Sequence, residues 1–263
     1  MSNVKIYILF VAFFMVGNTV NASVKECENT LNEILFSKVL VTKDDKLQAW
    51  REKSKDCNEN EVFIAIGKTK IYMKHGDLKN AKKTINAALK YKSKLTKYLE
   101  IYLIDIKFQE AAQAPTIDKD EFVLMVEGYE GLIAKYPDWY GGYSGLGSVY
   151  YSVGDNKNAE LLLFKASESE GADAVVFRML VLIYEQLEEY KKAIYSFDKA
   201  LKLNQNLIND KEMMISASYS YMYSGDLEFS KKILTLLYQE FPDIKTDKSY
   251  LNAGKALAKL WNR

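Results

Sequence analysis

Residues 143–166 read YSGLGSVYYSVGDNKNAELLLFKA, a stretch that predicts two helices joined by a tight turn. Gly154 supplies the permissive backbone that such a turn needs, and Asp155 stands where the second helix needs an N-terminal cap. The small residues Gly147 and Ala159 would let the two helices approach each other closely. The stretch therefore indicates a helical hairpin packed through small side chains.

The same pattern recurs along the chain at a regular interval. A Tyr is followed nine positions later by a small residue, with a turn between them, at Tyr72/Ala81, Tyr150/Ala159, Tyr184/Ala193 and Tyr221/Ser230. In three of these places the turn reads Gly-Asp, and the spacing of the turns fits repeats of about 34 residues with a few insertions. Such self-similarity is typical of stacked repeats, in which each unit buries its apolar face against its neighbours.

This pattern resembles the tetratricopeptide repeat (TPR), a helix-turn-helix of about 34 residues with aromatic, Leu-Gly, Tyr, Ala and closing Pro positions. Residues 143–166 match it best, and a poorer copy has predicted helices at 95–111 and 119–136 with an enlarged turn at 112–118. The resemblance implies an all-α fold, a right-handed α-solenoid of about five TPR-like repeats over residues 61–242. A different helical repeat with the same stacking is the alternative.

The two ends of the stack are predicted to carry capping elements. A C-terminal helix over residues 243–263 would close one end, and an N-terminal helical hairpin over residues 23–60 would close the other. Cys27 and Cys57 lie on either side of the expected joint of this hairpin, so antiparallel packing would bring them together. A disulfide bond there would stabilise the fold by roughly 3 kcal/mol, and two unpaired buried thiols are the alternative.

Residues 1–22 have the parts of a secretory signal peptide. A short basic start is followed by an apolar run over 6–16 and a polar stretch that ends at Ala22. The run is shorter than the roughly 20 residues that a membrane-spanning helix needs, so we expect cleavage after Ala22 and a periplasmic or secreted protein that does not span a membrane. An uncleaved anchor is the alternative.

The charge balance argues against a nucleic-acid partner. The full chain has 36 basic and 35 acidic residues, and removal of the signal peptide would take away Lys5 and leave the two signs equal. Proteins that bind nucleic acid normally carry a basic excess, because contacts to phosphate supply much of their affinity.

Catalytic, metal and cofactor motifs are missing from the sequence. Its one histidine, His75, precedes a Gly-Asp turn, where exposure to water is the simpler interpretation than a role in nucleophilic catalysis. Gly67-Lys68-Thr69 is similar to the end of a phosphate-binding loop, but Val62 stands where that motif requires its first glycine. We therefore expect a protein that is not an enzyme and that has no metal and no small-molecule cofactor.

The TPR resemblance implies where a partner would bind. In that family the first helices of successive repeats line a concave groove, and counting from Val62, Thr96, Tyr140, Ala174 and Lys211 as first positions gives the side chains that point into it. The predicted binding residues are Lys70, Lys74, Glu100, Phe108, Ser144, Ser148, Tyr151, Arg178, Glu185, Tyr219 and Tyr223. We expect the site to centre on Tyr151, Arg178, Glu185 and Tyr219. For apolar positions such as Phe63 and Leu182, packing against a neighbouring helix is the alternative.

This mixture of aromatic side chains and both signs of charge favours an extended peptide or a partner protein. The sequence therefore predicts a non-catalytic scaffold or adaptor in the periplasm, which would act in cell-envelope or secretion-system assembly. An immunity or inhibitor protein that neutralises an exported toxin or enzyme is the alternative, and an enzyme with an unrecognised site is the third.

Overall fold

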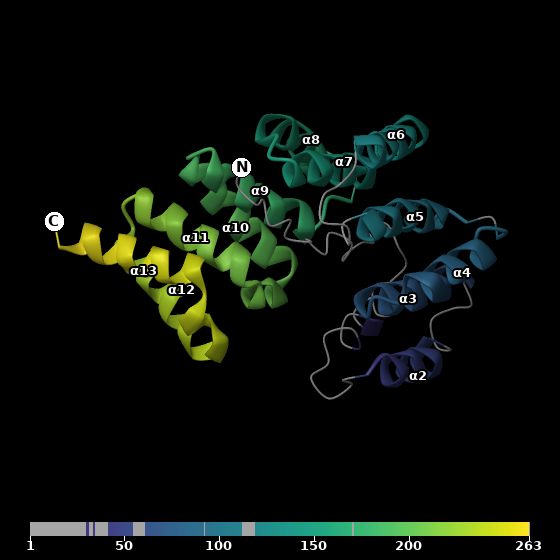
Figure 1. Cartoon of the computed structure of the whole chain (residues 1–263), viewed down its shortest axis with the longest axis horizontal. Helices are drawn as coiled ribbons and strands as arrows, with labels where there is room; N and C mark the ends of the chain where they lie inside the picture. Colours follow the sequence, from purple (N-terminus) through teal and green to yellow (C-terminus); the bar gives the residue numbers. More distant parts are fainter. Residues whose placement is uncertain are drawn as a thin grey trace.

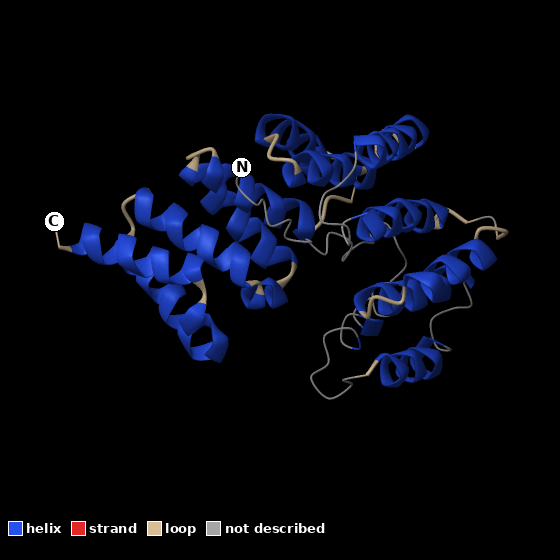
Figure 2. Ribbon diagram, viewed as in Figure 1, coloured by secondary structure: helices blue, strands red, loops and turns tan. Residues whose placement is uncertain are grey.

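A computed structural model describes residues 30–31, 34, 42–54, 61–91, 93–111, 119–169 and 171–262 of the chain. The described part is built from helices and connecting loops, and Figure 2 shows no strand in it. Its twelve α-helices are α2 (Lys43–Lys53), α3 (Glu61–Lys74), α4 (Leu78–Ala88), α5 (Thr96–Ala111), α6 (Lys119–Lys135), α7 (Tyr140–Ser152), α8 (Asn156–Glu168), α9 (Ala174–Gln186), α10 (Tyr190–Leu203), α11 (Lys211–Tyr223), α12 (Leu227–Glu240) and α13 (Lys248–Trp261). Two short 3₁₀ helices, η2 (Gln205–Asn209) and η3 (Pro242–Thr246), precede α11 and α13.

The helices from α3 to α12 form five consecutive pairs. Helix α3 packs on α4, α5 on α6, α7 on α8, α9 on α10 and α11 on α12, and each pair contacts the next. Figure 1 shows the pairs following one another along an arc from α2 to α13. The prediction of an all-α solenoid of TPR-like units is therefore confirmed, including the poorer second unit, whose helices are α5 and α6. The enlarged turn predicted at 112–118 lies outside the described residues.

The Gly-Asp turns work as their residue types predict. Gly76, Gly154 and Gly225 have φ angles of 71°, 82° and 100°, a backbone conformation that residues with a Cβ atom adopt at a cost. The Asp that follows each glycine caps the next helix, as Asp155 does when its Oδ1 accepts the Asn158 N–H at 3.2 Å. These turns fold each helix pair back on itself.

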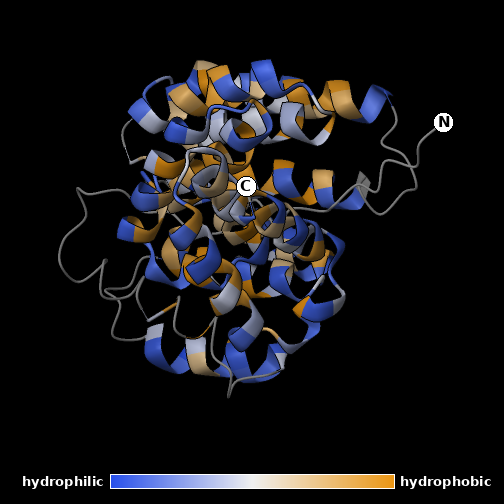
Figure 3. Cartoon of the chain, turned by 90° about the vertical axis from the view of Figure 1, so that its left-hand side faces the viewer, coloured by the Kyte–Doolittle hydropathy of each residue, from blue (hydrophilic) through white to orange (hydrophobic). Residues whose placement is uncertain are grey.

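Close approach of the paired helices depends on small residues. A Cβ atom on Gly147 would lie 2.7 Å from Cγ of Leu163, and Ala159 on the facing helix is fully buried. One cluster of buried side chains extends from α3 to α10 and a second from α9 to α13, so the core continues along the stack. Figure 3 shows hydrophobic and hydrophilic stretches alternating along the helices.

At the N-terminal end of the described solenoid, α2 packs on α3. Trp50 of α2 is fully buried, and its indole Nε1–H donates a hydrogen bond of 3.1 Å to the carbonyl oxygen of Ile64. The predicted signal peptide at 1–22 and the predicted bridge between Cys27 and Cys57 fall on residues outside the described part, so both stay predictions. Within the described helices, none combines the length and the apolar character that crossing a membrane requires.

At the C-terminal end, α13 lies against both α11 and α12. It buries Ala253 and Leu257, and the Tyr250 hydroxyl donates a hydrogen bond of 3.3 Å to the carbonyl oxygen of Leu234. Its outer face exposes Lys255 and Lys259 together with Leu251 and Trp261. Helix α13 therefore covers the apolar side of the last pair, as a capping helix should.

Candidate functional site

The first helices of the five pairs form one continuous layer. Helix α3 contacts α5, α5 contacts α7, α7 contacts α9 and α9 contacts α11. Side chains on one side of this layer can therefore act together although they come from repeats far apart in the sequence. The predicted binding residues all lie on these first helices.

Tyrosine rings gather where α9, α10 and α11 meet. The rings of Tyr219 and Tyr223, one turn apart on α11, stack with centroids 6.2 Å apart and an angle of 5° between their planes. Tyr190, the first residue of α10, stacks on Tyr223 with centroids 5.2 Å apart. Tyr190 and Tyr223 also border a surface hollow of about 440 Å³. An array of flat, partly exposed rings of this kind offers rigid apolar area together with hydroxyl groups that can form hydrogen bonds.

Glu185, near the end of α9, is close enough to Tyr190 and Tyr219 for its charge to act on both. Burial raises the pKa of its carboxyl group, and its charge in turn helps to raise the pKa values of Tyr190 and Tyr219, although desolvation is the larger cause for both tyrosines. No hydrogen bond or ion pair joins the Glu185 carboxyl group to any other residue in the described part of the chain. A half-buried carboxylate without a cationic partner is unfavourable, so this place would attract a positive group.

Tyr151 of α7 borders the same region from the neighbouring repeat. Its hydroxyl accepts a hydrogen bond of 3.1 Å from Nε2 of Gln186. Burial is the main cause that raises the Tyr151 pKa to about 12, and the negative charges of Glu212 and Glu185 add to it. We call Tyr151, Glu185, Tyr190, Tyr219 and Tyr223 the tyrosine patch.

Arg178, another of the predicted central residues, is held in ion pairs within the protein. Its Nε and one terminal nitrogen donate to the two oxygens of Asp210 at 2.7 and 3.2 Å, and that same nitrogen also donates to Glu212 at 2.8 Å. Only 11% of its side chain is exposed. Burial alone would lower the Arg178 pKa, but the two carboxylates outweigh that effect and raise it. Arg178 therefore joins α9 to the start of α11 and is not presented as an anchor for a partner.

The predicted lysines of α3 lie away from the tyrosine patch. Lys70 is buried, and its charge acts on the carboxyl group of Asp173 at the start of α9. Lys74 is half-buried, and burial together with the nearby charge of Lys46 lowers its pKa to about 8. His75 is exposed, as its place at the turn predicts.

The remaining predicted residues have structural contacts of their own. Glu100 forms an ion pair of 2.6 Å with Lys135, and Phe108 is a partly buried member of the hydrophobic cluster between α5, α6 and α7. Ser144 and Ser148 are buried in α7, and the Ser148 hydroxyl donates a hydrogen bond of 2.9 Å to the Ser144 carbonyl oxygen. The structure thus brings together Tyr151, Glu185, Tyr219 and Tyr223 and distributes the others along the stack.

Sequence reasoning missed Tyr190 and Gln186. The repeat register considers the groove positions of first helices, whereas Tyr190 begins a second helix, and Gln186 falls one position after a groove residue. The place of Tyr190 directly after the turn that ends α9 is the signal that could have found it. No group of three or more His, Cys, Asp or Glu side chains suited to a metal ion occurs among the described residues.

The sequence of this chain is similar to a curated protein over a short stretch only. No protein-family model matches this chain. A curated relative, anaphase-promoting complex subunit 3 of Schizosaccharomyces pombe, is 34% identical over 73 residues, which are 28% of this chain and only 10% of that protein.

Solved structures match over most of the chain but at low sequence identity. The match to the structure of pilF of Pseudomonas aeruginosa extends over 81% of this chain and 86% of the pilF chain, with a TM-score of 0.54 and 19% identity. The match to a thermophilic TPR protein of Thermus thermophilus extends over 74% of this chain and 99% of that protein's chain, with a TM-score of 0.51 and 15% identity. The match to a chain of the APC/C hetero-tetramer Cut9-Hcn1 extends over 89% of this chain but only 42% of that chain, with a TM-score of 0.57 and 14% identity. The chain therefore has the TPR-like solenoid fold.

Proposed function

We propose that this protein is a non-catalytic scaffold that holds a segment of a partner protein on the tyrosine patch. The fold supports this proposal, because TPR-like solenoids present long surfaces and commonly bind other proteins. In an exported compartment such a scaffold would serve as an adaptor in cell-envelope or secretion-system assembly. A structural neighbour named for an assembly, the Cut9-Hcn1 hetero-tetramer, is consistent with a role in holding proteins together.

The observation that carries the proposal is the unpaired carboxyl group of Glu185 beside stacked tyrosine rings. A Lys or Arg side chain of the partner would neutralise this carboxylate. The same cation would lie against the faces of Tyr190, Tyr219 or Tyr223, and a desolvated cation–π contact contributes up to about 2 kcal/mol. We therefore propose that the bound segment carries a basic residue at its centre.

Replacing Glu185 with Gln is expected to weaken binding of a basic peptide about tenfold, which corresponds to roughly 1.4 kcal/mol. The fold should be at least as stable as before, because the change removes the cost of a half-buried charge. The probe is a fluorescein-labelled peptide rich in Lys and Arg, compared by fluorescence anisotropy with a peptide that carries Gln at those positions. Circular dichroism measures the unfolding midpoint.

Glu240→Gln is the matched control, since Glu240 is an exposed carboxylate at the far end of α12. It removes the same charge and should leave affinity unchanged. Tyr219→Ala should lower affinity by a similar factor to Glu185→Gln. Equal loss of binding in Glu185→Gln and Glu240→Gln would show that net charge, rather than the tyrosine patch, attracts the peptide.

We also propose that the protein is exported and that its two cysteines form a bridge, on the strength of the signal-like segment before Ala22 and the placement of Cys27 and Cys57. The intact mass of the protein purified under non-reducing conditions should correspond to a chain that begins at Ser23. That mass should be lower by two hydrogen atoms than the mass after reduction. A chain that retains Met1 would rule out export by cleavage, and an unchanged mass on reduction would rule out the bridge.

A further inference from the structure

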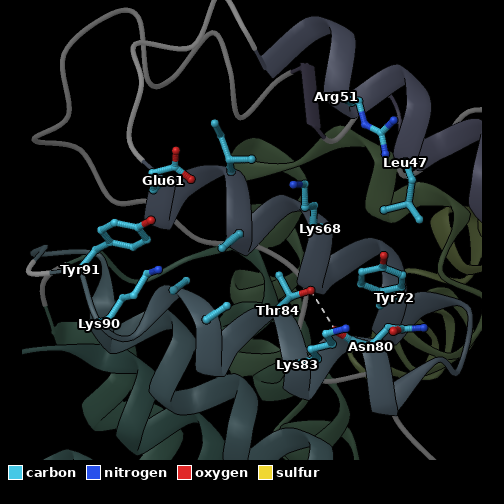
Figure 4. A pocket seen from close by; sticks show the side chains of 14 residues that line it. Leu47, Arg51, Glu61, Lys68, Tyr72, Asn80, Lys83, Thr84, Lys90 and Tyr91 are labelled. Carbon is cyan, nitrogen blue, oxygen red and sulfur yellow. Dashed lines mark hydrogen bonds between the residues drawn. The ribbon is translucent and has the colours of Figure 1, made fainter.

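A second surface feature lies at the other end of the solenoid, between α2, α3 and α4. It is an open cleft of about 410 Å³ whose lining includes the small side chains Ala65, Ala87 and Ala88. Figure 4 shows long polar side chains around this cleft, with Lys90 and Tyr91 on one side and Arg51 on the other. The small lining residues leave room for a bound chain, and the long side chains around them can contact it.

Four of the side chains that line the cleft are positively charged. They are Arg51 of α2, Lys68 of α3, Lys83 of α4 and Lys90 just after α4, and the acidic residue that lines the cleft with them is Glu61. The cleft therefore has an excess of about three positive charges, although the whole chain has a formal net charge of only +1. The excess is a local feature that the overall composition does not reveal.

The cations of the cleft are not neutralised within the described structure. No ion pair joins Arg51, Lys68, Lys83 or Lys90 to any described residue, and Lys90 instead lies 5.0 Å from the centre of the Tyr91 ring. Lysines nearby behave differently. Lys43 of α2 pairs with Asp77 at 2.6 Å, and Lys82 of α4 pairs with Glu110 at 2.6 Å. Cations kept unpaired around a cleft raise the local potential and attract an anionic ligand.

We propose that this cleft binds an acidic segment of a partner protein, at a site separate from the tyrosine patch. Carboxylates of the segment would pair with Lys68 and Lys83 near the middle of the cleft. Tyr72 and Tyr91, which also line it, would pack against the apolar parts of the same segment. Partly enclosed ion pairs of this kind orient a ligand and speed its association more than they add to affinity.

The two surfaces would then have opposite charge preferences. The tyrosine patch on α7 and α9–α11 offers a carboxylate to a basic residue, whereas the cleft offers cations to acidic residues. The basic cleft does not depend on the proposed function of the patch, because α2–α4 contribute none of the residues of that patch. Substitutions in one surface therefore leave the residues of the other surface unchanged.

The test uses the full chain and a fluorescein-labelled peptide of alternating Glu and Ala, with a peptide of alternating Gln and Ala as the neutral reference. Lys68→Glu/Lys83→Glu should weaken binding of the acidic peptide about tenfold. Lys255→Glu/Lys259→Glu on the outer face of α13 makes the same change in net charge and should leave the affinity unchanged. Raising the salt concentration should weaken wild-type binding, because the contacts are close to solvent.

Charge reversal at Lys68 could disturb packing, so the neutral variant Lys68→Gln/Lys83→Gln provides a second measurement, with circular dichroism to confirm that it is folded. It should lose affinity in the same direction but by a smaller factor. Equal effects of the cleft and α13 variants would overturn the proposal. The proposal would also be overturned if a single-stranded oligodeoxynucleotide of equal charge bound more tightly than the acidic peptide. That result would assign the cleft to nucleic acid.

Discussion

Replacing Gly145 with Ala is expected to lower the free energy of unfolding by about 2 kcal/mol. A Cβ atom at this position of α7 would overlap the ring of Tyr129 on α6. Tyr129 has little freedom to move, because its ring is buried and its hydroxyl donates a hydrogen bond to the buried carboxyl group of Asp105. Forcing extra atoms into a packed core typically costs 1–3 kcal/mol, which outweighs the gain of about 1 kcal/mol in helix propensity.

Gly131→Ala is the matched control for this prediction. Gly131 lies inside α6, and a Cβ atom there would have no other atom within 4 Å. The same added methyl group should therefore stabilise the protein by up to about 1 kcal/mol through helix propensity alone. Urea unfolding followed by circular dichroism compares the two variants. Midpoints that shift in the same direction would show that contact with Tyr129 does not decide the effect.

Gly145 also matters for the position of the tyrosine patch. Close contact between α6 and α7 fixes where α7 lies, and α7 carries Tyr151 to the edge of the patch. Weaker packing at Gly145 should therefore reduce binding of the basic peptide as well as stability. This coupling is expected because each repeat of a solenoid is held by contacts with its neighbours.

The repeat pattern predicted four turns, of which three carry a Gly-Asp pair. The Gly-Asp pairs predicted three turns and their helix caps, and each glycine has the positive φ that its turn requires. The fourth turn, between α9 and α10, has no glycine, and Glu188 adopts a φ of 60° there. The pair α9/α10 still forms, because Ala193, Phe197 and Ala200 bury one face of α10. Apolar periodicity decided this fold more strongly than turn chemistry did.

The site was predictable only in part, because ion pairs between repeats depend on how the helices stack. The repeat register predicted a site centred on Tyr151, Arg178, Glu185 and Tyr219. In the structure Tyr151, Glu185 and Tyr219 lie close enough for the Glu185 charge to act on both tyrosines, and Tyr223 of the wider predicted set stacks on Tyr219. It did not reveal that Arg178 pairs with Asp210, since the two lie on different repeats.

A signal for this pairing was present in the sequence. Asp173 and Asp210 both stand directly before a first helix, and each caps it through its side chain. At Asp210 this capping carboxylate also pairs with Arg178 of the preceding first helix.

The second large effect is expected from Asp105→Asn, which should make the protein more stable than wild type at pH 8. Asp105 of α5 is buried, and desolvation raises the pKa of its carboxyl group to about 7, although the hydrogen bond from Tyr129 opposes the shift. Asn keeps an oxygen that can accept this hydrogen bond and has no charge to bury. The variant therefore removes the cost of an ionised group in the core.

The sign of the pH dependence follows from the two pKa values of Asp105. In the unfolded chain this group titrates near 3.8, and in the folded chain it titrates near 7. Between these values the folded protein binds the extra proton, so stability falls as pH rises, by up to about 1.4 kcal/mol per pH unit. Above pH 7 this contribution no longer changes, and below pH 4 the cost has disappeared.

Urea midpoints measured for wild type and Asp105→Asn at several values between pH 5 and pH 8 test the prediction. The stability gap should be largest at pH 8 and should shrink toward pH 5. Asp173, whose pKa burial raises to about 8, adds a pH dependence of the same sign, but it is present in both proteins and cancels from the difference. Parallel curves for the two proteins would show that Asp105 does not titrate in this range. A gap that closes toward pH 5 would establish that a single buried carboxyl group between α5 and α6 adjusts the stability of the repeat that precedes the tyrosine patch.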